Sequence, residues 1–305
     1  MIAFGCSITD PKMYERCARP GIEVASEPDS ELFAYSSAGS LFRSYNIILD
    51  LAAARDDLEA LVLVHQDAEI VDPNFCSKLR RALSDPEVAL VGAGGAVGVR
   101  SIAWWQGSVT WASFTTRFEE LGGGDVPGLS WHRDEIPSFA QTGEVDTIDG
   151  FVIGMSPWAV RELRFDESLG KIHGYDFDLC CQARSLGRKV VTEDLRVIHH
   201  HSLDLIGDFE GWIAAHIKVA EKWDGRMPGG GDRDLGDDWK QRARQAEARA
   251  AGLQIMAKMA EHFYGRGEAL ERELNIVRAS RTWRATAPLR AAGQWARRVR
   301  TRLRR

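Results

Sequence analysis

The chain has 305 residues, of which 44% are apolar and 27% are charged, values typical of a soluble globular protein. This length suits one large α/β domain with an appendage. No apolar run approaches the roughly 18 residues that a membrane-spanning helix needs, which argues against an integral membrane protein. Five cysteines occur, without Cys-x-x-Cys spacing, at positions 6, 17, 76, 180 and 181. They argue against a disulfide framework or a cysteine zinc site and predict a reducing, cytoplasmic location.

The predicted elements of the first third of the chain alternate between strands and helices. Strands are expected at 1–8, 21–25, 61–64 and 88–92, and helices at 12–18, 41–51 and 73–84, with Ser40 as the N-cap of the second helix. This alternation predicts a mostly parallel α/β sheet. The glycines of 92–98 invite a dinucleotide-binding interpretation. We reject it, because their spacing is not Gly-x-Gly-x-x-Gly and no clear helix pattern follows.

Residues 101–145 are rich in tryptophan and glycine and show weak periodicity. They predict an elaborated loop over a site, because clustered exposed aromatic side chains suit sugar rings and nucleotide bases. Trp104 and Trp105 are the first candidates for such contacts. The alternative, that these tryptophans fill a core, stays open.

The next part of the chain again predicts regular elements. Strands are expected at 145–155 and 189–198, and helices from Asp176 to Gly187 and over 208–222. The Pro/Gly run at 227–232 marks a linker. The predicted organisation is a catalytic domain at 1–225, a linker at 226–236, a helical extension at 237–277 and a basic tail at 278–305. The extension is a candidate surface for a homodimer.

The formal net charge of −5 is unevenly distributed. From Val277 onward there are ten arginines and no acidic residue, so subtracting this +10 leaves −15 on residues 1–276. The arginines of 278–305 alternate with tryptophans and aliphatic residues, which predicts binding to an anionic membrane surface and a peripheral location at the inner face of the membrane. The acidic remainder argues against a nucleic-acid partner. A solvated tail without a partner is the alternative.

Three groups of polar side chains follow apolar strands or begin a helix. Asp67 with a histidine from 199–201 makes a mixed oxygen and nitrogen site that suits Mn²⁺ or Mg²⁺. His199 and His201 share one side of a continuing strand, so they are preferred to His200. Asp176 is a candidate general base. The alternatives are a helix-dipole partner for Asp176 and a solvated loop or a fortuitous metal-binding tract for the histidines.

Four motifs carry a resemblance to a known family. They are Val64-His65-Gln66-Asp67, Ile148-Asp149-Gly150-Phe151, the run from His173 to Leu179, and Ile198-His199-His200-His201-Ser202. Their order and spacing over residues 1–222 resemble a GT-A glycosyltransferase of family 2 type, and more narrowly the streptomycin-biosynthesis type. Residues 280–290 resemble a C-terminal element of bacterial sugar transferases. The resemblance implies a Rossmann-like, mostly parallel sheet flanked by helices.

The resemblance also implies roles for single residues. Asp67 would hold a divalent cation and the donor diphosphate, together with Gln66, and His199 or less favourably His201 would complete the metal site. Asp176 would be the catalytic base. The nucleotide would lie near Ser7 and Asn46, and the sugar or acceptor near Asp149, Gly150, Trp104 and Trp105. The sequence departs from the family pattern at His65, Gln66 and Tyr175, where acidic residues are usual, although Glu69 could assist the cation.

The predicted function is therefore transfer of a sugar from a nucleotide diphosphate sugar to an acceptor hydroxyl, inverting and metal-assisted. The acceptor would be a glycan, a lipid-linked molecule or a small molecule. One alternative is a non-catalytic module that binds nucleotide sugars or glycans on the same fold. The other is a metal-dependent hydrolase that uses Asp67 and the histidines.

Overall fold

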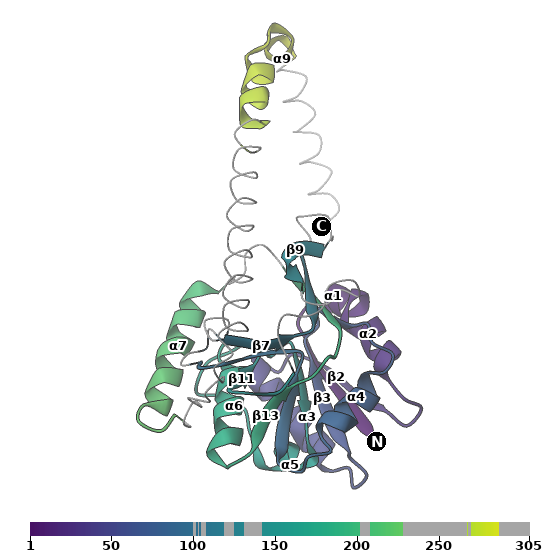
Figure 1. Ribbon diagram of the computed structural model, residues 1–305. Helices are drawn as coiled ribbons and strands as arrows, with labels where there is room; N and C mark the ends of the chain where they lie inside the picture. Colours follow the sequence, from purple (N-terminus) through teal and green to yellow (C-terminus); the bar gives the residue numbers. More distant parts are fainter. Residues whose placement is uncertain are drawn as a thin grey trace. The chain divides into compact units, whose positions relative to one another are not determined.

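The computed structural model describes residues 1–99, 102, 104, 108–118, 125–130, 142–201, 208–227, 267 and 270–286 (Figure 1). The chain divides into two compact units, 1–249 and 250–305. Within the described ranges, no helix combines the length and the apolarity that crossing a membrane requires.

A seven-stranded sheet forms the centre of the first unit, with the order β10-β13-β5-β12-β3-β1-β2. Its strands are β1 (Ile2–Ile8), β2 (Glu31–Ser36), β3 (Ala60–Val64), β5 (Val88–Gly92), β10 (Glu144–Val145), β12 (Val152–Met155) and β13 (Lys189–Thr192). β1 runs parallel to β2 and β3, and β13 runs parallel to β5, whereas β12 is antiparallel to both of its neighbours. All residues of β3 and β5 are buried, as expected for central strands covered on both faces.

Two smaller sheets extend this centre. One has the order β11-β6-β7, and the other β4-β14-β8-β9. Their strands are β4 (Ala68–Ile70), β6 (Gly94–Val97), β7 (Ser108–Ala112), β8 (Phe114–Phe118), β9 (Asp125–Ser130), β11 (Thr147–Ile148) and β14 (Val197–His201). The expectation of a loop at 101–145 is therefore wrong where strands β7 to β10 lie. The expected single strand at 189–198 is also divided: β13 belongs to the large sheet and β14 to a smaller one, and Arg196 between them has a positive φ of 45°.

Helices cover both faces of the large sheet. The described part of this unit contains the helices α1 (Pro11–Arg16), α2 (Ala18–Ala25), α3 (Leu41–Ala53), α4 (Phe75–Ala82), α5 (Pro157–Glu162), α6 (Tyr175–Ser185) and α7 (Phe209–Trp223). The Phe4 ring contacts Phe75 of α4, whereas a Cβ on the next residue, Gly5, would lie 2.5 Å from Ile48 of α3. Successive strand residues point to opposite faces, so α3 and α4 lie on opposite sides. The predicted α/β class with a mostly parallel, helix-flanked sheet is confirmed.

Two local expectations have different outcomes. Ser40 caps α3 as predicted, and its hydroxyl accepts a hydrogen bond from the Arg43 backbone N–H at 3.1 Å. The strand expected at 21–25 is wrong, because these residues belong to α2. Gly21 lets α2 approach β4 so closely that a Cβ there would lie 2.3 Å from the Ile70 backbone nitrogen.

The second unit is helical where it is described, over 270–279 and in α9 (Arg281–Ala285). Most of the predicted linker at 226–236 and of the extension at 237–277, and residues 287–305 of the basic tail, lie outside the described residues. The predicted domain limits, the homodimer surface and the membrane-binding tail therefore stay predictions.

Candidate functional site

The ends of three parallel strands meet at one edge of the large sheet and form a polar cleft. Ser7 is the next-to-last residue of β1, Ser37 follows β2, and His65 follows β3. The lining residues are Ser7, Thr9, Ser37, Gly39, Ser40, Leu41, His65, Gln66, Asp67, Lys171 and Ile172. Such a cleft at the carboxyl ends of parallel strands is where open α/β sheets bind ligands. The predicted strand end at Asp67 therefore lies on a cleft, together with the predicted Ser7 and Gln66.

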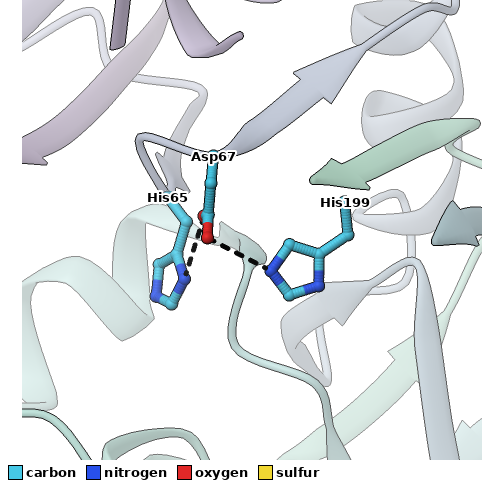
Figure 2. Close-up of side chains that lie close together, drawn as sticks. All are labelled: His65, Asp67 and His199. Carbon is cyan, nitrogen blue, oxygen red and sulfur yellow. Dashed lines mark ion pairs between the residues drawn. The ribbon is translucent and has the colours of Figure 1, made fainter. Parts of the chain in front are cut away.

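Two imidazoles and one carboxylate converge here, and two of these groups, those of His65 and Asp67, line the cleft (Figure 2). His65, Asp67 and His199 each offer one ligand atom, and these atoms lie within 4.8 Å of one another. The Nδ1 atom of His65 is 3.8 Å from one oxygen of Asp67, and the Nε2 atom of His199 is 3.7 Å from the other. These separations exceed hydrogen-bond length and leave room for an ion between the donors. The donor set fits a divalent cation.

Backbone pairing brings the two halves of this cluster together. β14 pairs antiparallel with β4, so that His199 lies opposite Ala68. The His200 N–H donates to the Asp67 carbonyl at 2.8 Å, and the His65 N–H donates to the Phe151 carbonyl at 2.9 Å. The Phe151 ring stacks on the His199 ring at 4.6 Å. The three side chains are therefore held by strand pairing and ring packing before any ion binds.

Electrostatics favours a positive charge at this point. Burial lowers the pKa of His199, but the carboxylates of Asp67 and then Asp149 raise it by more, so the net shift is upward. The carboxylates of Asp67 and Asp149 thus favour a positive charge beside His199. A metal ion would compete with a proton for this imidazole, since a ligating imidazole must be neutral.

The neighbouring histidines are used differently. Side chains alternate along β14, and the His200 Nε2 atom contacts the Glu69 carboxylate at 2.8 Å. Glu69, expected as an assistant for the cation, is thus engaged with His200. The side chain of His201, the second predicted ligand, lies outside the described residues.

Asp176, the predicted base, lies in the first turn of α6. Its carboxylate accepts hydrogen bonds from the Gly150 N–H at 3.1 Å and the Phe177 N–H at 2.8 Å. Burial, with the nearby charge of Asp149 as the second cause, raises the pKa of Asp176 to about 7. A carboxylate with such a pKa can both take up and release a proton near neutral pH.

The residues predicted to face the sugar or acceptor are partly placed. Asp149 follows β11, and burial raises its pKa despite opposing contributions from His199 and from a hydrogen bond with the buried Trp104. Gly150 contacts Asp176 as described. Trp105 lies outside the described residues. Asp149 and Trp104 therefore share one polar contact, and the charge of Asp149 acts on Asp176.

Two of the predicted donor residues hold the scaffold. The Gln66 side-chain oxygen accepts hydrogen bonds from the Thr9 and Asp10 backbone N–H groups, both at 2.8 Å, and so fixes the turn after β1. The Asn46 amide exchanges two hydrogen bonds with the backbone of Phe165, at 2.8 and 2.9 Å. Asn46 is not among the cleft-lining residues, so its predicted role in nucleotide binding has no support from its position.

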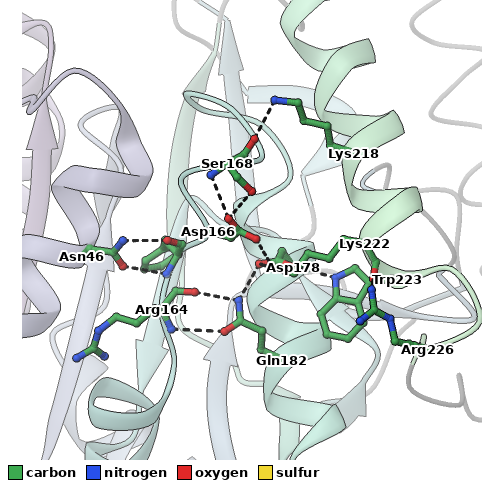
Figure 3. A network of polar contacts seen from close by, with 11 residues as sticks. Asn46, Arg164, Asp166, Ser168, Asp178, Gln182, Lys218, Lys222, Trp223 and Arg226 are labelled. Carbon is green, nitrogen blue, oxygen red and sulfur yellow. Dashed lines mark hydrogen bonds and ion pairs between the residues drawn. The ribbon is translucent and has the colours of Figure 1, made fainter.

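A buried polar network secures the helix that carries Asp176 (Figure 3). Asp178, 1% exposed, accepts hydrogen bonds from the Trp223 indole N–H at 2.8 Å and from Gln182 at 2.7 Å. Lys222 bridges Asp178 and Asp166 at 2.8 and 2.7 Å. α7 is thereby attached to α6 and to the loop that leads to Lys171, on the cleft.

Sequence reasoning missed three residues of the site. In the sequence His65 stands out only as a departure from an acidic pattern, although its spacing of two residues from Asp67 is a signal for a shared ligand set. Lys171, which adds a positive charge to the cleft, lies in a stretch without a readable pattern. Phe151 was assigned to a strand, and no sequence signal indicates its stacking on His199.

A mostly parallel sheet with a cleft at the carboxyl ends of its strands is the usual ligand-binding arrangement of open α/β proteins. The chain belongs to the glycosyltransferase-like family, whose sequence model matches residues 3–205. The family predicted from the motifs, and the glycosyltransferase class, are thereby confirmed.

Individual relatives agree with this family. The streptomycin biosynthesis protein StrF of Streptomyces griseus is 27% identical over 205 residues, which cover 66% of this chain and 67% of StrF. The O-antigen biosynthesis protein RfbC of Myxococcus xanthus is 26% identical over 182 residues, or 56% of this chain and only 13% of RfbC.

Solved structures show weaker likeness. The structure of GalNAc-T7 with UDP, GalNAc and Mn²⁺ superposes with a TM-score of 0.47 at 12% sequence identity. The matched region covers 87% of this chain and 57% of the GalNAc-T7 chain. The mannosyltransferase PcManGT of Pyrobaculum calidifontis, in complex with GDP-Man and Mn²⁺, superposes with a TM-score of 0.46 at 13% sequence identity. The matched region covers 95% of this chain and 84% of the PcManGT chain.

Proposed function

We propose that the chain transfers a sugar from a nucleotide diphosphate sugar to an acceptor hydroxyl, with inversion and with the help of a divalent cation. The observation that carries this proposal is the convergence of His65, Asp67 and His199, of which His65 and Asp67 line the cleft at the ends of β1, β2 and β3. Family membership supplies the reaction class, and the cleft supplies the surroundings of the donor.

The cleft suits the parts of such a donor. The hydroxyl groups of Ser7, Thr9 and Ser37 can exchange hydrogen bonds with a ribose or a base. Lys171 can pair with a phosphate oxygen. A cation bound by His65, Asp67 and His199 would neutralise the charge that develops on the leaving diphosphate. Mixed imidazole and carboxylate ligands favour Mn²⁺ over Mg²⁺, which prefers oxygen ligands alone.

The second chemical requirement is a base for the acceptor hydroxyl. Asp176 satisfies it, because its pKa of about 7 makes the ionised form available at neutral pH while its affinity for a proton remains high. Two backbone N–H groups fix its carboxylate. One base that activates the acceptor for a single in-line displacement leads to inversion at the sugar carbon.

The test is a thermal shift against UDP-, GDP- and dTDP-sugars with and without Mn²⁺, followed by assay of slow donor hydrolysis. We expect one nucleotide series to raise the melting temperature only with Mn²⁺, and donor hydrolysis to be lost in Asp176→Asn while nucleotide binding persists. Stabilisation without any turnover would instead favour a non-catalytic binding module. Unchanged turnover in the Asn variant would remove Asp176 from the mechanism.

A further inference from the structure

One contact links the cation cluster to the helix that carries the base. The Tyr175 hydroxyl lies 2.6 Å from the Nε2 atom of His65. The opposite ring nitrogen of His65, Nδ1, faces Asp67. One imidazole therefore has its outer nitrogen occupied by a protein hydroxyl and its inner nitrogen directed into the cluster.

The Tyr175 side chain is held rigidly in this position. It is 6% exposed, and its ring lies against Phe42, Tyr45 and Phe165 with centroid distances of 6.2, 6.0 and 6.1 Å. A tyrosine hydroxyl can accept a hydrogen bond from an imidazole N–H as well as donate one.

Gly150 makes room for this hydroxyl. A Cβ at Gly150 would lie 2.1 Å from the Tyr175 oxygen, which no real contact allows. The same glycine donates its N–H to Asp176. Gly150 therefore contacts both Tyr175 and Asp176, and any side chain at this position would displace the tyrosine from His65.

We propose that Tyr175 is a positioning residue that accepts a hydrogen bond from the Nε2–H of His65 and so directs the Nδ1 lone pair toward the cation. This inference rests on the proposed function, because it needs the cation that His65, Asp67 and His199 would hold. An imidazole carries one proton when neutral, and fixing that proton on Nε2 leaves Nδ1 free as a ligand. Partners of this kind orient the ring, and their loss weakens metal binding.

The test is Mn²⁺ binding to the full chain without nucleotide, measured by isothermal titration calorimetry and by the free Mn²⁺ signal in electron paramagnetic resonance. Tyr175→Phe keeps the ring and removes the hydroxyl, and we expect Mn²⁺ affinity about 10- to 100-fold weaker than in the wild type. The matched control is Tyr45→Phe. Tyr45 belongs to the same aromatic cluster, and its buried hydroxyl has no hydrogen-bond partner within the described residues, so its removal should leave Mn²⁺ affinity unchanged.

Every outcome decides the matter. Equal affinity in Tyr175→Phe and wild type overturns the inference and leaves the proposed function intact. An equal loss in Tyr45→Phe also overturns it, because packing would then explain the effect. Absence of Mn²⁺ binding to the wild type overturns both the cation site and the inference. Circular dichroism verifies folding, and if Tyr175→Phe does not fold, Gly150→Ala decides, with weaker binding expected and wild-type affinity contradicting the role of Tyr175.

Discussion

The rate of sugar transfer should rise with pH through neutrality, because the proposed base is a carboxylate with an unusually high pKa. The pKa of Asp176 is raised from 3.8 to about 7, and only its ionised form can accept the acceptor proton. With that value, about one tenth of the molecules are active at pH 6 and about nine tenths at pH 8, so kcat/KM should rise about tenfold between them. An ordinary carboxylate would give a flat profile over this range.

The assay is the initial rate of donor hydrolysis or transfer in overlapping buffers between pH 5 and 9. The cation must be saturating at every pH, because protonation of His199 competes with metal binding at the low end. Asp176→Asn should lower kcat by about 10²- to 10⁴-fold and remove the dependence on this group. A flat wild-type profile between pH 6 and 8, at saturating cation, would refute the reasoning.

Stability supplies an independent measurement of the same shift. A raised pKa means that the folded chain binds the Asp176 proton more tightly than the unfolded chain does. Ionisation of Asp176 therefore lowers the free energy of unfolding as the pH rises from 3.8, the ordinary pKa of the carboxyl group, to above about 7. Asp176→Asn should accordingly gain in melting temperature, relative to wild type, as the pH is raised from 5 to 8.

Three further predictions concern the supporting residues. His199→Ala should lose Mn²⁺ affinity, whereas His200→Ala, on the other side of β14, should retain it; equal losses in calorimetry would contradict the assignment. Gln66→Ala should raise the KM for the donor with little change in kcat, since Gln66 fixes the turn after β1 and lines the cleft; an unchanged KM would exclude this role. Asp178→Ala leaves a lysine and an indole N–H without their buried acceptor, and it should lower the free energy of unfolding by about 3 kcal/mol or more; urea denaturation measures this, and a loss below about 1 kcal/mol would contradict it.

Sequence reasoning predicted those parts of the fold that depend on local pattern. The unbroken apolar run of β3, the capped amphipathic helix after Ser40 and the strand at 88–92 all have strong local signals, and the structure contains them. It failed at 21–25 and within 101–145. The first segment mixes β-branched residues with helical spacing, and the second gains its strands from pairing with distant partners such as β14 and β6.

The sequence could predict which strands bring residues to the site, but not which side chains contact one another there. Asp67 follows a predicted strand and His199 follows another, so the sequence predicts them as neighbours, whereas His65 and Tyr175 stand out only as departures from an acidic pattern. The structure shows that these two departures contact one another. A single sequence cannot reveal such a pair, because the two residues lie 110 positions apart and neither carries a periodic signal.

The pairing of β4 with β14 also bears on when the site can form. It joins Glu69 and His200, which lie 131 positions apart, so closing this loop is entropically costly and should occur late in folding. A ribosome-bound chain that has exposed only the first four strands can pair β1 with β2 and β3 and already contains His65 and Asp67, but it lacks His199. An ion that binds both Asp67 and His199 would stabilise the closed form of this long loop. It should therefore slow hydrogen exchange in β14 more than in β3.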